Sequence, residues 1–320
     1  MAFLITGGAG FIGSHLGERL LRLGYEVVVL DNFNDYYNPD IKQRNIEFIK
    51  DHSSYTLVKG DILDWDGLNS LFKKHSIEGI IHLAARAGVR PSIEQPRLYQ
   101  KVNVEGTVNL LEAACRYRVP KFLLASSSSV YGNNTKVPFS ETDSVDHPVS
   151  PYAATKKACE LIAYTYHSMY KIPVTCLRFF TVYGPRQRPD MAIHKFTAQM
   201  VRGEEILMFG DGSTQRDYTY IDDIIQGLEQ ALNHCTEGYK IYNLGESRTI
   251  RLMDLINLLE KALDKPARIK KMPLQKGDVK TTYADISLAQ KELEYSPRFS
   301  IEEGISRFVS WYCKELGRDR

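Results

Sequence analysis

The sequence lacks the features of several broad classes of protein. Its 41 Lys and Arg residues nearly balance its 39 Asp and Glu residues, and the formal charge of +2 argues against a nucleic-acid binder that relies on neutralising phosphates. No apolar run approaches the roughly 18 residues that a membrane span needs. The start, MAFLITGGAGFIG, has no basic stretch ahead of a long apolar segment, so no signal peptide is predicted.

Cysteine is scarce and scattered. The 5 cysteines lie far apart and form no CxxC pair. An odd, scattered set is typical of reduced thiols in a cytoplasm, and it disfavours both a disulfide framework and a zinc site. The 8 histidines show no metal-ligand spacing either. We therefore expect a cytoplasmic protein without a bound metal.

Short apolar runs alternate with helical patterns through the first half of the chain. The runs cover residues 3–6, 26–30, 55–59, 79–83, 121–125 and 173–177, and the clearest helical patterns cover 12–23, 103–117 and 152–170. Strands that alternate with helices predict a doubly wound parallel sheet with both faces covered. We expect an α/β, Rossmann-like domain over residues 1–178.

After Arg178 the composition of the sequence changes, and the pattern predicts loops rich in Gly, Pro and charged residues. Helices are expected here over 194–202, 221–234, 252–263 and 301–316. We predict a smaller C-terminal substrate-binding lobe over 179–212 and 251–320, with a segment of about 213–250 returning to the first domain. Ligands of such folds bind outside the strand ends, so the crevice between the two parts is the expected site.

The stretch LITGGAGFIGSHL places Gly7, Gly10 and Gly13 between the first expected strand and the first expected helix. A turn alone would explain a lone glycine triplet. In this context, however, glycines allow a tight turn, a close approach of backbone N–H groups to a pyrophosphate, and close packing of helix on strand. The pattern predicts a bound dinucleotide.

Two aspartates at strand ends fit the same ligand. Asp31 follows the glycines at near the usual spacing for a carboxylate that holds the adenosine ribose hydroxyls. Asn32 and Phe33 follow it, rather than an arginine that would accept a 2′-phosphate, and this favours NAD over NADP. Asp61 ends the third strand, where it would meet the adenine. The predicted cofactor-binding residues are Gly7, Gly10, Phe11, Ile12, Gly13, Asp31, Asn32, Asp61, Ile62, Leu83, Ala84, Ala85, Tyr152 and Lys156.

The stretch SPYAATKKACE brings a phenol and an ammonium together. Ser150 and Pro151 predict a helix start, so Tyr152 and Lys156 share one helix face about one turn apart. One interpretation is a surface tyrosine beside a solvated lysine. The other is that the ammonium stabilises a phenolate, which then removes a proton near neutral pH.

Six motifs follow one another over nearly the whole chain, in the order of a known family: TGGAGFIGSHL, HLAARAGVR, SSSSVYG, SPYAATKKACE, LRFFTVYGPRQRPDMA and GDGSTQRDYTYIDD. In them the sequence resembles the extended short-chain dehydrogenase/reductases, and among these the nucleotide-sugar 4-epimerases, particularly those of UDP-glucuronate. The resemblance implies that Tyr152 is the base, that Lys156 lies at the nicotinamide ribose, and that Ser127 bridges the sugar oxygen and Tyr152. A merely polar strand end would also explain the serine run. The alternatives to Ser127 are Ser126, Ser128 and Ser129.

The resemblance further implies a UDP-sugar substrate, NAD as a bound prosthetic group, and a homodimer paired through the helices at 103–117 and 152–170. Thr181 and Arg188 take the positions that hold the C6 carboxylate of a uronate, for which a guanidinium supplies charge-assisted bonds. Arg186 is a second candidate, and loop ion pairs would explain both arginines. The predicted substrate-binding residues are Arg90, Ser127, Ser128, Tyr152, Phe180, Thr181, Arg186, Arg188, Arg216 and Asp278.

The sequence departs from the families that it resembles at two places, one that bears on the reaction and one that bears on UDP binding. The 4,6-dehydratases carry an Asp-Glu pair just before the VYG segment and the UDP-glucuronate decarboxylases carry a Glu, whereas this chain has Ser128 and Ser129. Both of those reactions are disfavoured, because the carboxylic acid that usually carries the proton is missing. Near Asp278, Gln275 and Lys276 stand where many relatives have a second arginine, which weakens the expectation of UDP binding.

The resemblance thus implies 4-epimerisation of UDP-glucuronate to UDP-galacturonate through a transient 4-keto sugar. One alternative is a UDP-glucose or UDP-N-acetylglucosamine 4-epimerase, which would not need Arg188. Others are a UDP-glucuronate decarboxylase and a non-catalytic NAD-binding sensor. The sensor is disfavoured because Ser127, Tyr152 and Lys156 are all present.

Overall fold

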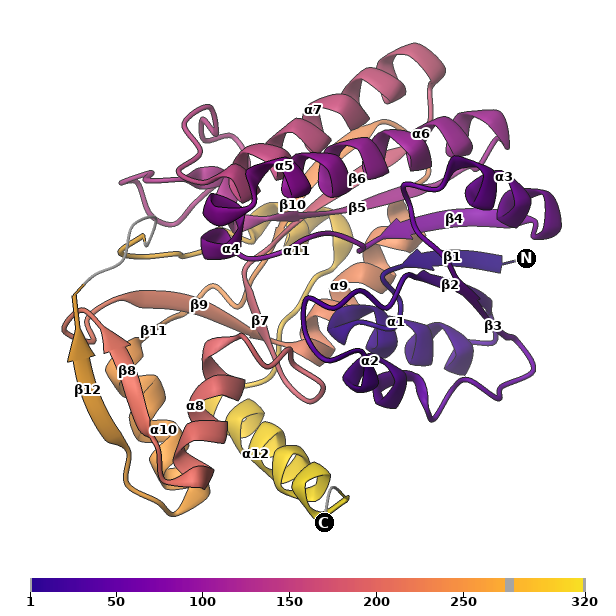
Figure 1. Cartoon of the computed structure of the whole chain (residues 1–320). Coiled ribbons are helices and arrows are strands. Elements are labelled where there is room, and N and C mark those ends of the chain that lie inside the picture. Colours follow the sequence, from indigo (N-terminus) through magenta and orange to yellow (C-terminus); the bar gives the residue numbers. More distant parts are fainter. Residues whose placement is uncertain (1, 274–278, 319–320) are drawn as a thin grey trace.

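The computed structural model describes residues 2–273 and 279–318. Its larger part is a seven-stranded parallel sheet with the strand order β10-β6-β5-β4-β1-β2-β3 (Figure 1). The strands are β1 (Ala2–Thr6), β2 (Glu26–Asp31), β3 (Tyr55–Lys59), β4 (Ile77–His82), β5 (Phe122–Ser127), β6 (Val174–Phe179) and β10 (Tyr239–Leu244). The predicted Rossmann-like class is confirmed, and the order reverses between β1 and β4, where such sheets bind ligands.

Helices cover both faces of this sheet. On one face lie α3 (Trp65–Lys74), α6 (Gly106–Arg116) and α7 (Pro151–Tyr170), and on the other lie α1 (Phe11–Arg22) and α9 (Ile221–His234) (Figure 1). Because neither face meets solvent, β2 is buried at every residue after its first. Successive strand residues serve opposite layers, so that Leu4 belongs to one hydrophobic core and Ile5 to the other.

The smaller C-terminal lobe contains a three-stranded sheet, β11-β9-β7, and a two-stranded sheet, β12-β8. Its elements are β7 (Thr181–Tyr183), α8 (Ala192–Arg202), β8 (Glu205–Phe209), β9 (Gln215–Tyr220), β11 (Thr249–Arg251), α10 (Leu252–Leu263), β12 (Arg268–Met272) and α12 (Ile301–Arg318). Within the segment of about 213–250, α9 and β10 return to the large sheet, whereas β9 stays in the lobe because it pairs with β7.

Short elements connect these layers. They are α2 (Pro39–Ile46), α4 (Val89–Glu94), α5 (Pro96–Tyr99), a π-helical turn (Gln100–Glu105), a 3₁₀ turn (Ser128–Tyr131) and α11 (Ser287–Leu293). The helix predicted over 103–117 is therefore a π-helical turn followed by α6. Its buried Asn103 accepts a hydrogen bond from the Arg86 backbone N–H and donates to the Thr155 hydroxyl, which ties the loop after β4 to α7.

Among the described residues, no helix is long and apolar enough to cross a membrane. Within the same ranges, no group of three or more His, Cys, Asp or Glu side chains is arranged to hold a metal ion.

Candidate active site

A cavity of about 380 Å³ opens at the carboxyl edge of the seven-stranded sheet, on segments that follow β1, β2, β4, β5 and β6. It unites the glycine motif, the serine run and the Tyr-Lys pair in one place, as the fold predicts for a ligand site. The predicted residues that line it are Gly7, Gly10, Phe11, Ile12, Gly13, Asp31, Asn32, Asp61, Ile62, Leu83, Ala84, Ala85, Ser127, Ser128, Tyr152, Lys156, Phe180, Thr181 and Arg188.

The turn between β1 and α1 has no room for side chains. Gly7 has a φ of +69°, and a Cβ atom there would lie 2.9 Å from the Ala84 Cα atom. A Cβ atom on Gly13 would lie 2.5 Å from the Gly7 carbonyl oxygen. Gly10, the residue just before α1, provides no side-chain cap, so the first N–H groups of the helix are left for a ligand. A narrow turn with open N–H groups fits a pyrophosphate.

Asp31 ends β2 with its carboxylate held from three sides. The backbone N–H groups of Ala9 and Phe33 donate to it at 3.1 and 2.9 Å, and Lys42 Nζ lies 3.7 Å from Oδ1. Burial lowers the pKa of Lys42, and the charge of Asp31 opposes this only in part. The sequence suggested no cation next to Asp31; the structure brings one there from α2, and Lys42 also lines the cavity.

Asp61 and Asn32 form the neighbouring polar wall. The Asn32 side-chain amide donates to Asp61 Oδ2 at 2.8 Å, and the backbone N–H of Leu63 donates to Oδ1 at 2.9 Å. Both acidic side chains predicted for the nucleoside end of the dinucleotide therefore line one continuous wall of the cavity.

Helix α7 orients the predicted base. The Ser150 side chain caps the helix by accepting from the Ala153 N–H at 3.1 Å, and Pro151 occupies the first turn. Lys156 is only 5% exposed, and its Nζ donates to the Ala125 carbonyl of β5 at 2.7 Å. A lysine so placed is not a solvated surface residue, so the surface interpretation of the pair with Tyr152 is wrong.

Beneath the pair, a buried histidine is kept neutral. His82 lies between the hydroxyls of Thr6 and Thr107, at 2.8 and 3.0 Å. Burial, followed by the positive charge of Lys156, lowers its pKa to about 3. Lys156 is thus the group that carries the positive charge at this end of the cavity.

The serine run divides into different environments. Ser127 lies at the end of β5, where its Oγ donates to Ser129 Oγ at 3.1 Å and accepts from the Ser129 N–H at 3.2 Å. The Ser126 hydroxyl instead donates to Glu160 Oε1 at 2.7 Å inside the core. All four serines line the cavity, but Ser126 is bonded to a core carboxylate, whereas the Ser127 hydroxyl bonds, among the described residues, only to Ser129 of the same run.

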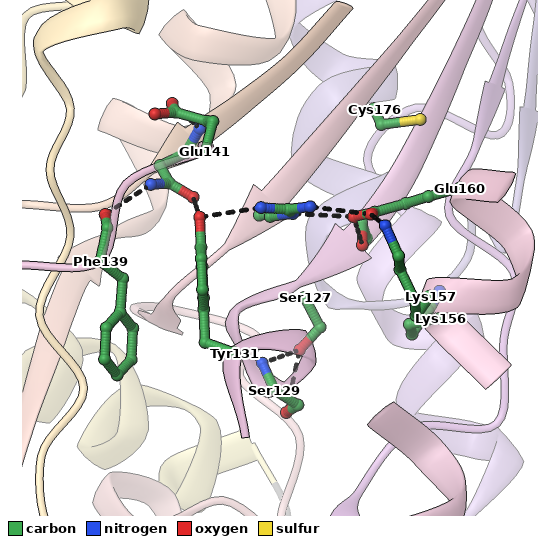
Figure 2. A network of polar contacts seen from close by, with 12 residues as sticks. Ser127, Ser129, Tyr131, Phe139, Glu141, Lys156, Lys157, Glu160 and Cys176 are labelled. Atoms are coloured by element: carbon green, nitrogen blue, oxygen red, sulfur yellow. Dashed lines mark hydrogen bonds and ion pairs between the residues drawn. The ribbon is translucent and has the colours of Figure 1, made fainter. Parts of the chain in front are cut away.

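A buried polar network supports this strand end (Figure 2). Arg178 of β6 donates to both oxygens of Glu160 from Nε and Nη2, each at 2.9 Å, and from Nη1 to the Tyr131 hydroxyl at 3.0 Å. The Tyr131 hydroxyl donates onward to Asn243 of β10 at 2.7 Å. Burial raises the pKa of Glu160, but the bonds to Arg178 outweigh it and hold the pKa below its usual value. The network fixes α7 against β5, β6 and β10.

A third cation, after Lys42 and Lys156, lines the cavity from the segment that follows β7. Arg188 donates from Nε and Nη2 to the two carboxylate oxygens of Asp190, at 3.0 and 2.9 Å. Its guanidinium carbon lies 5.5 Å from the ring centre of Tyr36, which also lines the cavity. Burial lowers the pKa of Arg188, but the charge and hydrogen bonds of Asp190 raise it above its usual value overall. Arg188 is therefore a fixed positive charge.

Of the two candidate arginines, only Arg188 lines this cavity. Arg186 pairs with Glu18 of α1 at 2.8 Å and lies outside the cavity wall, which does not favour it as a substrate ligand. Arg90 also lies outside, with its guanidinium carbon 4.9 Å from the ring centre of Phe209 in β8. Its side chain bridges the large domain and the lobe.

The two remaining substrate predictions concern the diphosphate end. Arg216 of β9 donates from Nη1 to the Gln215 carbonyl at 2.8 Å and does not line the cavity. Asp278 lies outside the described residues.

Several cavity residues escaped the sequence analysis. Lys42 and Tyr36 lie in a segment after β2 without a recognisable motif, so only the tertiary fold reveals them. Asp190 is not part of the cavity wall, but it pairs with Arg188, which is. An acid two residues after an arginine is a sequence signal of such an ion pair.

Comparison with known proteins places these features in a family. The family model described as GDP-mannose 4,6 dehydratase matches residues 4–308. A UDP-glucuronate 4-epimerase of Thermodesulfobacterium geofontis is 44% identical over 97% of this chain and 95% of its own.

Two solved structures are similar over 99% of this chain and 100% of their own. The UDP-glucuronic acid 4-epimerase of Bacillus cereus, in complex with UDP-glucuronic acid and NAD, is 39% identical with a TM-score of 0.93. The UDP-glucose 4-epimerase of Thermotoga maritima, with UDP-glucose, is 34% identical with a TM-score of 0.91. On the family match and on these relatives, the chain, with its glycine turn and its Tyr-Lys pair, belongs to the GDP-mannose 4,6-dehydratase family of extended short-chain dehydrogenase/reductases, among the NAD-dependent nucleotide-sugar epimerases.

Proposed function

We propose that this protein is a 4-epimerase that interconverts UDP-glucuronate and UDP-galacturonate with bound NAD. The observation that carries the proposal is that Tyr152, the predicted base, and Arg188, a fixed cation suited to a carboxylate, line the same cavity. The relatives named as UDP-glucuronate 4-epimerases support the choice of substrate.

The cavity has a suitable group for each part of NAD. We assign the pyrophosphate to the glycine turn and the open start of α1, the adenosine ribose to Asp31 and Lys42, and the adenine to the wall at Asp61. Lys156 is assigned to the nicotinamide ribose. When bound, NAD would accept a hydride from C4 of the sugar and return it.

The residues of the chain handle the proton. Tyr152 takes the proton of the C4 hydroxyl and gives it back when C4 is reduced, so no net proton is consumed. The buried ammonium of Lys156, fixed on the Ala125 carbonyl, favours the phenolate by its charge. When the sugar binds, the single hydroxyl hydrogen of Ser127 turns from Ser129 Oγ to the sugar oxygen, while the Ser129 N–H continues to donate to Ser127 Oγ and orients it. Between the two half-reactions the 4-keto sugar turns over and presents its other face.

At C6, Arg188 is the proposed partner of the uronate carboxylate, with the Thr181 hydroxyl beside it. Charge-assisted bonds from a guanidinium are among the stronger hydrogen bonds in proteins. For the diphosphate we propose Arg216, which lies on the lobe. Arg90, at the junction of the lobe and the large domain, is proposed as a further cation near the sugar crevice. Asp278, outside the described residues, remains a predicted substrate-binding residue.

A UDP-glucose 4-epimerase is the second candidate. The observation that favours it is the pair of Arg188 with Asp190, because the charge of Arg188 is compensated before any substrate binds. The Thermotoga maritima relative bears the name of that activity.

The test is a parallel incubation of the purified protein with UDP-glucuronate, UDP-glucose and UDP-N-acetylglucosamine, followed by separation of the products. We expect UDP-galacturonate from the uronate, at a higher kcat/KM than for either neutral sugar. A preference for UDP-glucose would replace the proposal by the second candidate. A UDP-pentose product would indicate a decarboxylase, and NAD binding without any turnover would indicate a sensor.

We also propose a cytoplasmic homodimer that pairs through α6 and α7. Helix α7 leaves apolar side chains on its outer face, with Leu161 55% and Tyr164 52% exposed. A second copy that presents the same two helices would cover them in a four-helix contact.

A further inference from the structure

Arg188 meets the cavity with only part of its guanidinium engaged. Its Nε and Nη2 atoms each donate to one oxygen of Asp190, so this edge is fully paired. A guanidinium has five N–H bonds, and the two on Nη1 have no hydrogen-bond partner within residues 2–273 and 279–318. The side chain is 23% exposed toward the cavity that it lines. Asp190 thus fixes one edge of Arg188 and leaves another edge for a substrate.

Asp190 is itself held as a charged group. Burial raises the pKa of its carboxyl, but the charge and hydrogen bond of Arg188 outweigh burial and keep the pKa below its usual value. The Tyr36 hydroxyl also donates to Asp190 Oδ2, at 3.4 Å. A substrate carboxylate on Arg188 would therefore share a single positive charge with a second, permanently negative carboxylate.

In a 4-epimerase, it matters that Asp190 and the substrate carboxylate would share the charge of Arg188. Both hydride transfers use the same face of the cofactor, so the ring must leave its first position and seat again with its other face forward. A C6 carboxylate bound to Arg188 must be released for that movement. Releasing it from a cation without another partner would leave a largely buried charge unpaired, which is unfavourable. With Asp190 in place, Arg188 keeps a partner throughout.

We propose that Asp190 is a positioning residue that competes with the substrate carboxylate for Arg188 and thereby allows the 4-keto sugar to detach and turn. The inference rests on the proposed uronate substrate. It predicts an unusual pattern, in which loss of the Asp190 charge strengthens ground-state binding of UDP-glucuronate and slows its turnover. A purely structural role would weaken binding and turnover together.

The experiment compares Asp190→Asn with the wild type. In a Tyr152→Phe background, which blocks turnover, calorimetry should show UDP-glucuronate binding to the Asp190→Asn protein about tenfold more tightly, with UDP-glucose affinity unchanged. In the Tyr152-containing enzyme, kcat for UDP-glucuronate should fall by about tenfold and KM should fall with it. The absorbance of reduced nicotinamide in the steady state should rise, because the keto sugar waits longer before it is reduced again.

Two further variants control for folding and for generic loss of an ion pair. Asp190→Glu keeps the charge and should restore most of kcat. Glu204→Gln removes a similar pair two residues apart, in which Arg202 donates from Nε and Nη2 to Glu204 at 2.8 and 3.0 Å on the surface, and should change nothing. Weaker UDP-glucuronate binding in Asp190→Asn, or kcat and affinity lost together, would overturn the inference while the proposed function stands. If the wild type does not epimerise UDP-glucuronate, the proposed function fails and this inference fails with it.

Discussion

Tyr152 and Lys156 show how single residues acquire a role from their surroundings. Lys156 cannot swing into solvent, because it is 5% exposed and bonded to a strand carbonyl. Its charge therefore stays at a fixed place under the cavity floor, one helical turn from Tyr152. The tyrosine packs edge to face on Tyr99, with ring centres 6.3 Å apart, and this restricts its ring as well. Both side chains are thus held in place, as the proposed acid–base role requires.

Removing the phenolic hydroxyl tests the base. Tyr152→Phe should lower turnover by at least about two orders of magnitude, because only the proton acceptor is removed. NAD content, measured after denaturing the purified protein, should stay at the wild-type level. Tyr170→Phe is the matched control, since Tyr170 lies at the far end of the same helix and is 54% exposed. Turnover near the wild-type level in Tyr152→Phe would refute the assignment.

Asp31 and Lys42 give a test of cofactor choice. The wild type should bind NAD more tightly than NADP, because the Asp31 carboxylate repels a 2′-phosphate despite the ammonium 3.7 Å away. Asp31→Asn should weaken the binding of NAD. It should also raise the affinity for NADP, because Lys42 would then face the 2′-phosphate of NADP without a neighbouring negative charge. Adding Lys42→Ala should abolish the gain in NADP affinity. Calorimetric titrations that show equal affinities for both dinucleotides in the wild type would contradict this.

Sequence reasoning reached the residues whose roles depend on local spacing. The glycine turn and the Tyr-Lys pair each depend on a few neighbouring positions, so the sequence alone is enough to recognise their motifs. Lys42 and Tyr36 reach the cavity only because the chain after β2 folds back over it, which no periodicity encodes. The separation of Arg188 from Arg186 is likewise tertiary, because Glu18 of α1 draws Arg186 away.

At the scale of elements, α7 must keep a fixed position relative to β5, because Tyr152 and Ser127 come from these two elements. The bidentate pair of Glu160 with Arg178 provides that connection. Figure 2 shows Glu160 and Tyr131 on opposite sides of the guanidinium, which bonds to both. The alternation of strands and helices predicted the large sheet correctly. It could not predict this pair, because its partners come from different elements and meet only in the packed core.

The element connection can be tested by thermodynamic coupling. Arg178→Met should lower the free energy of unfolding by about 3–5 kcal/mol, because it leaves Glu160 charged and buried without its partner. Adding Glu160→Leu should recover much of that loss, since the uncompensated charge is removed. Denaturant titrations of the two single variants and the double variant measure the coupling. If the loss of unfolding free energy in the double variant equals the sum of the losses in the two single variants, Arg178 and Glu160 contribute to stability independently of each other, contrary to this account.

At the scale of the whole molecule, the cavity lies on the large domain and the lobe contributes to one wall. Several contacts hold the two parts together. His15 of α1 bonds the Pro185 carbonyl at 2.9 Å, and Arg186 pairs with Glu18 on the same helix. Helix α1 therefore serves the cofactor turn at its start and anchors the segment that carries Arg188 along its side.

The prediction for the whole molecule concerns the proposed homodimer. Leu161→Glu, on the outer face of α7, should convert a dimer to a monomer, because it places a charge in the proposed contact. Light scattering coupled to size-exclusion chromatography gives the mass. Phe48→Glu replaces another exposed apolar side chain, 66% exposed and remote from α7 in sequence, and should leave the mass unchanged. A wild type that is monomeric at micromolar concentration would rule out the proposed pairing.

The most direct measurement compares kcat/KM for UDP-glucuronate and UDP-glucose in the wild type, Arg188→Ala and Arg186→Ala. Loss of charged hydrogen bonds worth roughly 1.5–3 kcal/mol each should lower the uronate value by about 10-fold to 1000-fold in Arg188→Ala, with little change for UDP-glucose. Arg186→Ala should leave both values near the wild type, because Arg186 pairs with Glu18 outside the cavity wall. Unchanged uronate kinetics in Arg188→Ala, or a wild type that prefers UDP-glucose, would contradict the uronate assignment.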